Sequence, residues 1–195
     1  MSHDPFVDRV FANLPRVGGR FDFASWRHAG RSTNEGVGVL PQAGIDPDAV
    51  ARCVMDVDHY KGNVDYVDEC RTIPDPAFDP PRTVRFYQRI KLPMLGSVHH
   101  ELVLRDLGER DGWRVLAWDM HPGTDALDSK RGARSEYSVG AWLARPDAVA
   151  YALSSAPRKD DVGRLKFAAL TKGADAGAAK VVQTNIEGMI RWSRR

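Results

Sequence analysis

Two groups of histidines and carboxylates offer the clearest chemistry in this chain. His99, His100 and Glu101 are consecutive, and Asp119 and His121 follow further along. If these residues lie on strands, the side chains of His99 and Glu101 point to the same face and that of His100 points to the opposite face. Asp119 and His121 are also two residues apart, so they would share a face of their own strand. Such side chains suit zinc, but no HExxH, CxxC or comparably specific spacing accompanies them. We therefore predict that the protein binds no metal.

Other candidates for catalysis or cofactor binding are weaker. Asp56, Asp58 and His59 could pair a carboxylate with an imidazole for acid–base chemistry, but a group of this kind after a helix is typical of a solvated turn. Ser154 and Ser155 lack the GxSxG context of a nucleophile elbow. The glycine-rich segments contain neither GxGxxG nor a GK[ST] phosphate loop, so we expect no cofactor.

Polar residues that interrupt apolar patterns are more informative. Gln88, His100 and Tyr137 each lie among apolar residues at alternate positions, and Asn185 lies inside an apolar helical stripe. A buried polar group without a partner costs roughly 1–3 kcal/mol. Either each finds a partner within the protein, or some of them reach a cavity and meet the polar end of a ligand.

The length and composition are those of one globular domain or two very small ones. The chain has 195 residues, 43% hydrophobic and 28% charged, which excludes a disordered or fibrous protein. A net charge of +2 gives no strong field, and we predict no nucleic-acid partner. Cys53 and Cys70 cannot make a disulfide framework, and the N-terminus lacks a secretory-signal pattern. These features predict a cytoplasmic protein with reduced thiols.

Periodicity places the elements that must position these residues. Asp4-Pro5 and Asp46-Pro47 are each typical of a helix start, because Asp caps the helix and Pro fits its first turn. Residues 57–63 are expected to be a loop, and 64–72 are either extended or helical. Alternation or turn signals predict strands, and the final third has the helical period. The predicted strands are 20–26, 36–40, 84–92, 98–107, 113–120, 134–144 and 148–154, and the final helical segments are 160–172 and 174–192.

An antiparallel meander followed by one long helix predicts an α+β fold. The apolar stripe of the last helix needs cover, so the helix must lie across one face of a sheet of about six or seven strands. The stripe comprises Ala178, Val181, Val182, Asn185, Ile186, Met189 and Ile190.

Several segments together resemble the START-related polyketide cyclase and Bet v 1-like superfamily, and its lipid-binding START branch in particular. They are MDVDHY at 55–60, VRFYQRIKLP at 84–93, which is similar to the START strand ending in K-x-P, and HHELVLRD at 99–106. In the last of these, His100-Glu101-Leu102-Val103 stands where the family usually has an Arg-Asp pair. Gly140-Ala141-Trp142 and the closing helix complete a likeness that covers residues 36–193.

The resemblance implies a helix-grip fold, in which a curved antiparallel sheet wraps around the long C-terminal helix and encloses an apolar cavity. The chain would be one START-like domain over 1–195, with an N-terminal extension over 1–35 and the core over 36–193. Asn185 and Met189 on the helix would face the cavity, with sheet residues opposite. The expected ligand-binding residues are Phe86, Gln88, His100, Leu102, Trp118, Tyr137, Asn185 and Met189.

Three functions remain open from the sequence. We favour a non-catalytic protein that binds, and transfers within the cell, a lipid, sterol or polyketide-like molecule. The alternative is a cyclase, aromatase or hydrolase-like enzyme that uses Tyr87, His100, Asp119 or Tyr137 as acid or base. The third is a structural or regulatory partner protein with a filled core and no ligand.

The cationic C-terminus, residues 191–195, bears on partners. It could touch an anionic membrane during transfer, although the helix dipole alone also favours cations there. The expected partners are therefore a hydrophobic small molecule and, transiently, a membrane, with the oligomeric state left open.

Overall fold

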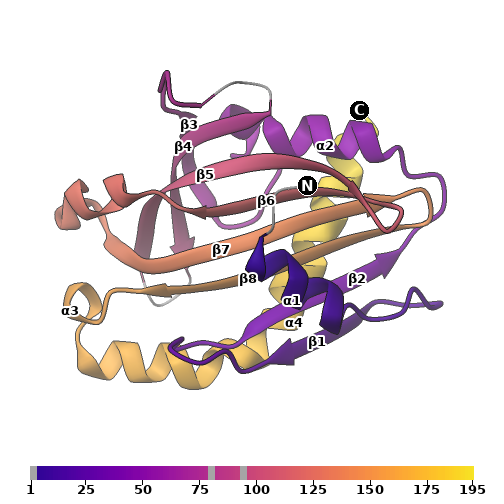
Figure 1. Ribbon diagram of the computed structural model, residues 1–195. Coiled ribbons are helices and arrows are strands. Elements are labelled where there is room, and N and C mark those ends of the chain that lie inside the picture. The colour runs from indigo at the N-terminus through magenta and orange to yellow at the C-terminus, as the bar shows by residue number, and fades with distance from the viewer. Residues whose placement is uncertain (1–3, 79–81, 93–95) are drawn as a thin grey trace.

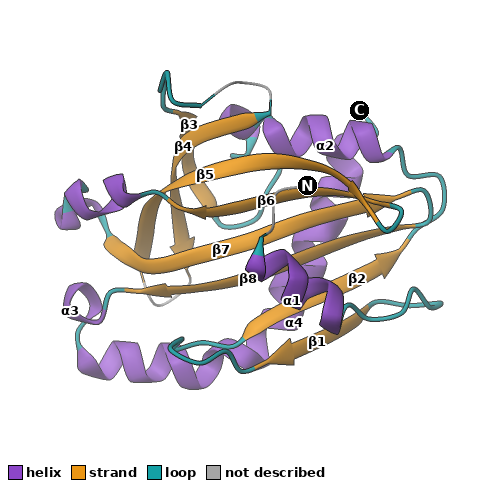
Figure 2. Cartoon of the chain, viewed as in Figure 1, coloured by secondary structure: helices purple, strands orange, loops and turns teal. Residues whose placement is uncertain are grey.

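The computed structural model describes residues 4–78, 82–92 and 96–195, with side chains placed except at 92 and 169–176. Helices flank a sheet whose strands run through most of the chain (Figure 1, Figure 2). The helices are α1 (Pro5–Asn13), α2 (Pro47–Met55), α3 (Lys159–Val162) and α4 (Arg164–Ser193), with short 3-10 turns η1 (Val57–His59), η2 (Pro122–Ala126) and η3 (Ser129–Arg131). The strands are β1 (Asp22–Trp26), β2 (Glu35–Pro41), β3 (Val67–Thr72), β4 (Thr83–Leu92), β5 (Gly96–Arg110), β6 (Trp113–Met120), β7 (Ala133–Arg145) and β8 (Ala148–Pro157).

The strands form a single sheet in the order β1-β2-β8-β7-β6-β5-β4-β3. Neighbouring strands in this order are antiparallel. Beyond the end of β6, β5 and β7 pair directly and in parallel, with Val98 opposite Ala133 and His99 opposite Arg134. The α+β fold is confirmed. The sheet has eight strands rather than six or seven, because the segment that was ambiguous over 64–72 forms β3 along the edge of β4.

The two faces of the sheet carry separate apolar cores. We call inner the face that packs against α4 and α2, which includes Phe86, Leu102 and Trp142. We call outer the face that packs against α1, which includes Val115 and Ala141. Figure 1 shows α1 in front of the sheet and α4 behind it. The long helix therefore covers only the inner face, as its apolar stripe requires.

Local signals account for both N-terminal helices. The Asp4 carboxylate accepts hydrogen bonds from the backbone N–H groups of Phe6 and Val7, and Asp46 accepts one from Asp48. A proline follows each cap, where its missing N–H costs nothing. The helix that starts after Asp46 has nine residues, Pro47–Met55.

Close packing between β2 and α4 requires glycine. A Cβ at Gly38 would lie 2.5 Å from Cγ1 of Val182 and 2.7 Å from Cε2 of Phe21. A Cβ at Gly36 would lie 2.7 Å from Cζ of Phe23. The bare backbone of β2 thus lets the helix and two aromatic rings approach the sheet.

The C-terminal helical segment differs from the sequence expectation. Gly163 adopts φ 80°, which ends α3. The helix α4 then runs for 30 residues from Arg164, instead of beginning near 174. Residues 57–63, expected as a loop, begin with the 3-10 turn η1. No helix among the described residues is long and apolar enough to cross a membrane.

Candidate functional site

The candidate site lies on the inner face, where the strand registers align the expected ligand-binding residues. Phe86 pairs with Leu102 and Gln88 pairs with His100 between β4 and β5, and Trp118 of β6 pairs with Leu104. Alternation along each strand turns all of these side chains to the same side.

A hydrogen-bonded chain crosses three strands of this face. Nε2 of His100 lies 3.0 Å from Oε1 of Gln88, and Nδ1 lies 2.8 Å from Oγ of Ser135. His100 and Ser135 are buried, while Gln88 is half-buried. Burial, followed by the neighbouring His99, lowers the pKa of His100 to about 3. The imidazole is therefore neutral at ordinary pH and carries one ring hydrogen.

The position of Ser135 depends on a bulge. β6 ends at Met120, so β7 begins beside β5. The register of β7 with β8 shifts between Ser135 and Tyr137. The bulge adds a residue and turns these two side chains to opposite faces of the sheet, Ser135 inward to His100 and Tyr137 outward.

Tyr137 therefore does not join the expected site. Its hydroxyl lies 2.6 Å from Oγ1 of Thr33 and accepts a hydrogen bond from the Thr33 N–H at 2.9 Å. The guanidinium of Arg31 lies 4.2 Å from the ring centroid. The alternation of Tyr137 with Val139 is as expected, but their side faces α1 rather than α4. The expectation that Tyr137 lines the cavity was wrong in its choice of face.

Three aromatic side chains occupy the middle of the inner face. The ring centroids of Trp142 and Tyr151 are 4.2 Å apart, and Trp118 stacks on Tyr151 at 5.8 Å. Trp118 lies across Gly140, where a Cβ would clash with its ring. Burial raises the pKa of Tyr151, and its hydroxyl makes no hydrogen bond within the described part of the chain. Tyr151 was not foreseen as a site residue, although alternation with Val149 places it inward.

The two helix residues of the expected site are enclosed. Oδ1 of Asn185 accepts a hydrogen bond of 3.0 Å from the backbone N–H of Asp65. A Cβ at Gly188 would lie 2.9 Å from the carbonyl oxygen of Asn63, so the segment 61–66 lies directly on α4. Met189 is completely buried. Asn185 thus has a partner inside the protein, which was one of the two alternatives from the sequence.

Both faces of the sheet keep some partly accessible apolar residues. On the outer face, Ala117 and Ala141 are at most 2% exposed, whereas Trp26, Leu107 and Val139 are half-buried. On the inner face, Trp118 and Gln88 keep accessible surface, as do other residues of the core there. Others, which the sequence did not predict as ligand-binding residues, include Phe21, Phe23, Cys70, Met120 and Leu153.

Most candidates for acid–base catalysis lie away from the inner face. Tyr87 is buried on the outer face, where its hydroxyl lies 3.1 Å from Nδ1 of His99, and burial raises its pKa. Nε2 of His99 has no hydrogen-bonding partner among the described residues. Asp119 is exposed and pairs with Arg105. Of the four candidates, only His100 faces α4.

The histidines and carboxylates that were considered for metal binding or acid–base chemistry make other contacts. Glu101 accepts hydrogen bonds from Arg85, and Nδ1 of His121 accepts one of 2.9 Å from the N–H of Gly123. His59 and Asp56 form an exposed pair at 2.7 Å. No cluster of three or more His, Cys, Asp or Glu side chains suited to a metal occurs in the described ranges. The expected absence of a metal stays a prediction.

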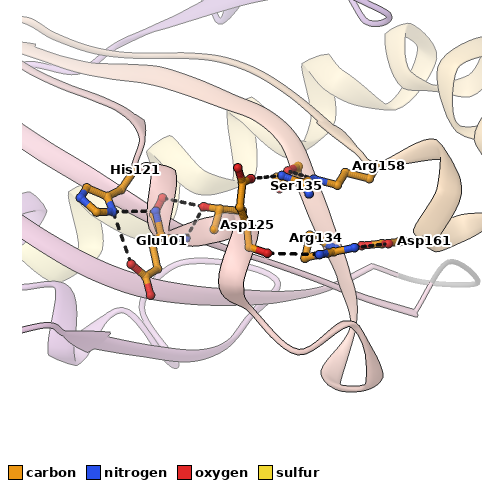
Figure 3. A network of polar contacts seen from close by, with 9 residues as sticks. Glu101, His121, Asp125, Arg134, Ser135, Arg158 and Asp161 are labelled. Carbon is orange, nitrogen blue, oxygen red and sulfur yellow. Dashed lines mark hydrogen bonds and ion pairs between the residues drawn. The ribbon is translucent and has the colours of Figure 1, made fainter.

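Ion pairs hold the strand that carries Ser135. Figure 3 shows Arg134 of β7 bound to Asp161 of α3, and Arg158 bound to Asp125 and to the backbone at Ser135. The hydrogen bonds from Arg134 lower the pKa of Asp161 to about 2. The start of β7, where Ser135 lies, is therefore tied to η2 and α3.

Comparison with solved structures identifies the fold. The STAR-related lipid transfer protein from Xanthomonas axonopodis superposes with a TM-score of 0.71 at 13% identity, over 93% of this chain and 97% of that one. Human STARD10 gives 0.68 at 13% identity, over 100% and 82%. The Zhui aromatase/cyclase of a Streptomyces strain gives 0.54 at 10% identity, over 90% and 95%.

These similarities confirm the helix-grip fold that the sequence resemblance implied. At such low identities they show the fold alone. No protein-family model matches the chain, and no curated protein sequence matches it.

Proposed function

We propose that this protein binds an apolar small molecule between α4 and the inner face of its sheet. The observation that carries the proposal is the apolar surface that stays accessible on the inner face, together with one polar side chain held there. Trp118, Leu153 and Phe23 are only partly buried in the core that packs against α4, and Gln88 on the same face is half-buried and bound to His100. A ligand that covers such apolar surface gains about 25 cal/mol of binding free energy for each Å² that is removed from water.

The fold supports this proposal. The similar structures include a STAR-related lipid transfer protein and an aromatase/cyclase. In the proposed complex, the aromatic group of Trp118, Trp142 and Tyr151 contacts the apolar body of the ligand. Gln88, backed by His100, meets its polar end. Transfer of the ligand between membranes is the further step that we propose for such a binding protein.

The enzymatic alternative has less support. Ser135 and His100 have the spacing of a nucleophile and its base, at 2.8 Å. However, Ser135 is fully buried, and a histidine whose pKa is about 3 is a weak base near neutral pH. The remaining acid–base candidates, Tyr87, Asp119 and Tyr137, face away from α4.

Native mass spectrometry of the protein purified from its own host tests the proposal. We expect a co-purified apolar molecule, and uptake of a fluorescent lipid after that molecule is removed. Ala178 lies on α4 one turn before Val182 and is half-buried, so Ala178→Trp should lower probe affinity at least tenfold and leave the melting temperature within a few degrees. Lys180→Trp, at an exposed position nearby, is the matched control and should bind normally.

Two results would contradict the proposal. One is the absence of both a co-purified molecule and probe uptake. The other is unfolding of Ala178→Trp, since a packed core rejects added volume at a cost of roughly 1–3 kcal/mol. Met189 is fully buried, so Met189→Trp should be destabilised by a similar amount whether or not the protein binds a ligand.

A further inference from the structure

We propose that the bound molecule presents an uncharged carbonyl oxygen to the side-chain amide of Gln88, whose N–H donors are aimed at the ligand by His100 and Ser135. This inference rests on the binding function proposed above. It names the chemical class of the ligand's polar end, which the fold leaves open.

The first step is the direction of the hydrogen bonds. A neutral His100 has one ring hydrogen, so it donates to one neighbour and accepts from the other. If Ser135 donates to Nδ1, then Nε2–H donates to Oε1 of Gln88. If the direction is reversed, Gln88 donates to Nε2 and Nδ1–H donates to Ser135.

The burial of Ser135 decides between the two directions. Ser135 is 0% exposed, and His100 is the partner that the described residues provide for its hydroxyl. In the reversed direction the serine hydrogen would have no acceptor, which is unfavourable in a buried site. The chain therefore runs from Ser135 through His100 to Gln88, in agreement with Oε1 of Gln88 facing the ring.

This direction leaves the amide nitrogen of Gln88 available. Its oxygen is used by His100, and both hydrogens of its NH₂ group remain on the half-buried side chain. Donors at the edge of an apolar site select a ligand oxygen that accepts. A ketone, ester or amide carbonyl satisfies them completely, whereas a hydroxyl accepts but brings a hydrogen of its own that needs a partner.

The surrounding side chains disfavour an anionic group. The neighbours of Gln88 on the inner face are uncharged among the described residues: Cys70 opposite it on β3, Phe86 and Ile90 on β4, and Leu102 on β5. Arg89 on the same strand points outward to Asp68. A carboxylate or phosphate would lose its hydration here without a cation to replace it.

Laurdan, a fluorescent long-chain naphthyl ketone, provides the test. Its affinity is compared with those of the alcohol made by reducing the ketone, the hydrocarbon in which CH₂ replaces the carbonyl, and a carboxylic acid of the same skeleton. We expect the wild-type protein to bind the ketone about tenfold more tightly than the hydrocarbon, with the alcohol weaker than the ketone and the acid weakest.

Variants separate the donor from its surroundings. Gln88→Met keeps the volume and removes both donors, so ketone and hydrocarbon should bind equally, with the hydrocarbon affinity within about twofold of wild type. Gln42→Met, the same substitution in the turn between β2 and α2, is the control and should keep the tenfold preference. Ser135→Ala frees His100 to reverse its hydrogen bonds, so the preference of ketone over alcohol should narrow.

The outcomes distinguish the two proposals. Equal uptake of all four probes by the wild type, or a preference for the alcohol or the acid, overturns this inference and leaves apolar binding in place. Uptake of none overturns both. If Gln88→Met does not fold, the four probes on the wild type and on Ser135→Ala still decide whether the site prefers a carbonyl oxygen.

Discussion

The burial of His100 predicts an acid-sensitive contribution to folding. Its pKa is about 3 in the folded protein against 6.5 for an ordinary histidine, and the main cause is burial. The unfolded chain therefore binds the proton more readily between about pH 3 and 6.5. The stabilising effect of neutral His100 is complete above pH 6.5 and is lost as the pH falls toward 3.

The size of the effect follows from the shift. Each unit of pKa corresponds to about 1.4 kcal/mol, so the folded state should lose about 2 kcal/mol from His100 between pH 6.5 and pH 5. His99 is also buried with a lowered pKa and adds to the loss. His59 acts in the opposite direction, because its exposed imidazole gains a proton more easily beside Asp56.

Urea unfolding at pH 7 and pH 5 measures this contribution. His100→Gln removes the titrating ring and keeps a polar side chain that can reach its neighbours. The variant should be less stable than the wild type at pH 7, and the gap between the two should narrow by about 2 kcal/mol at pH 5. His59→Gln, at an exposed site, is the control. The difference in unfolding free energy between this variant and the wild type should not become smaller at pH 5. The same pH dependence in His100→Gln as in the wild type would refute the reasoning.

Two further predictions concern how α4 is seated. Gly38→Ala should lower the free energy of unfolding in urea by about 1–3 kcal/mol, because the added Cβ would lie 2.5 Å from Cγ1 of Val182. Gly19→Ala, with open space around it, is the control and should be neutral or slightly stabilising. Equal stability of the two variants would contradict this packing. Asn185→Leu should leave the Asp65 N–H unpaired and cost about 1–3 kcal/mol, with faster amide hydrogen exchange confined to residues 61–66; unchanged exchange there would show that the side chain does not hold this segment.

The local elements could be predicted because their causes are local. The Asp-Pro pairs at 4–5 and 46–47 cap and start helices wherever they occur, and both helices form there. The period of two over 84–92 and the Asp111-Gly112 turn between β5 and β6 depend only on neighbouring residues. The fold class followed from their order, and the sequence resemblance specified the helix grip that the solved structures confirm.

The tertiary structure alone decided which face each strand residue occupies and which partner it finds. Alternation placed Tyr137 with Val139 and Leu143, but nothing within β7 distinguishes the side of α1 from the side of α4, since both are apolar. The bulge that turns Ser135 toward His100 arises where β6 ends and β7 meets β5, and that pairing joins residues far apart in the chain. Asn185 likewise binds the backbone of Asp65, a partner 120 residues away. Periodicity reports which residues share a side, whereas long-range register decides what that side meets.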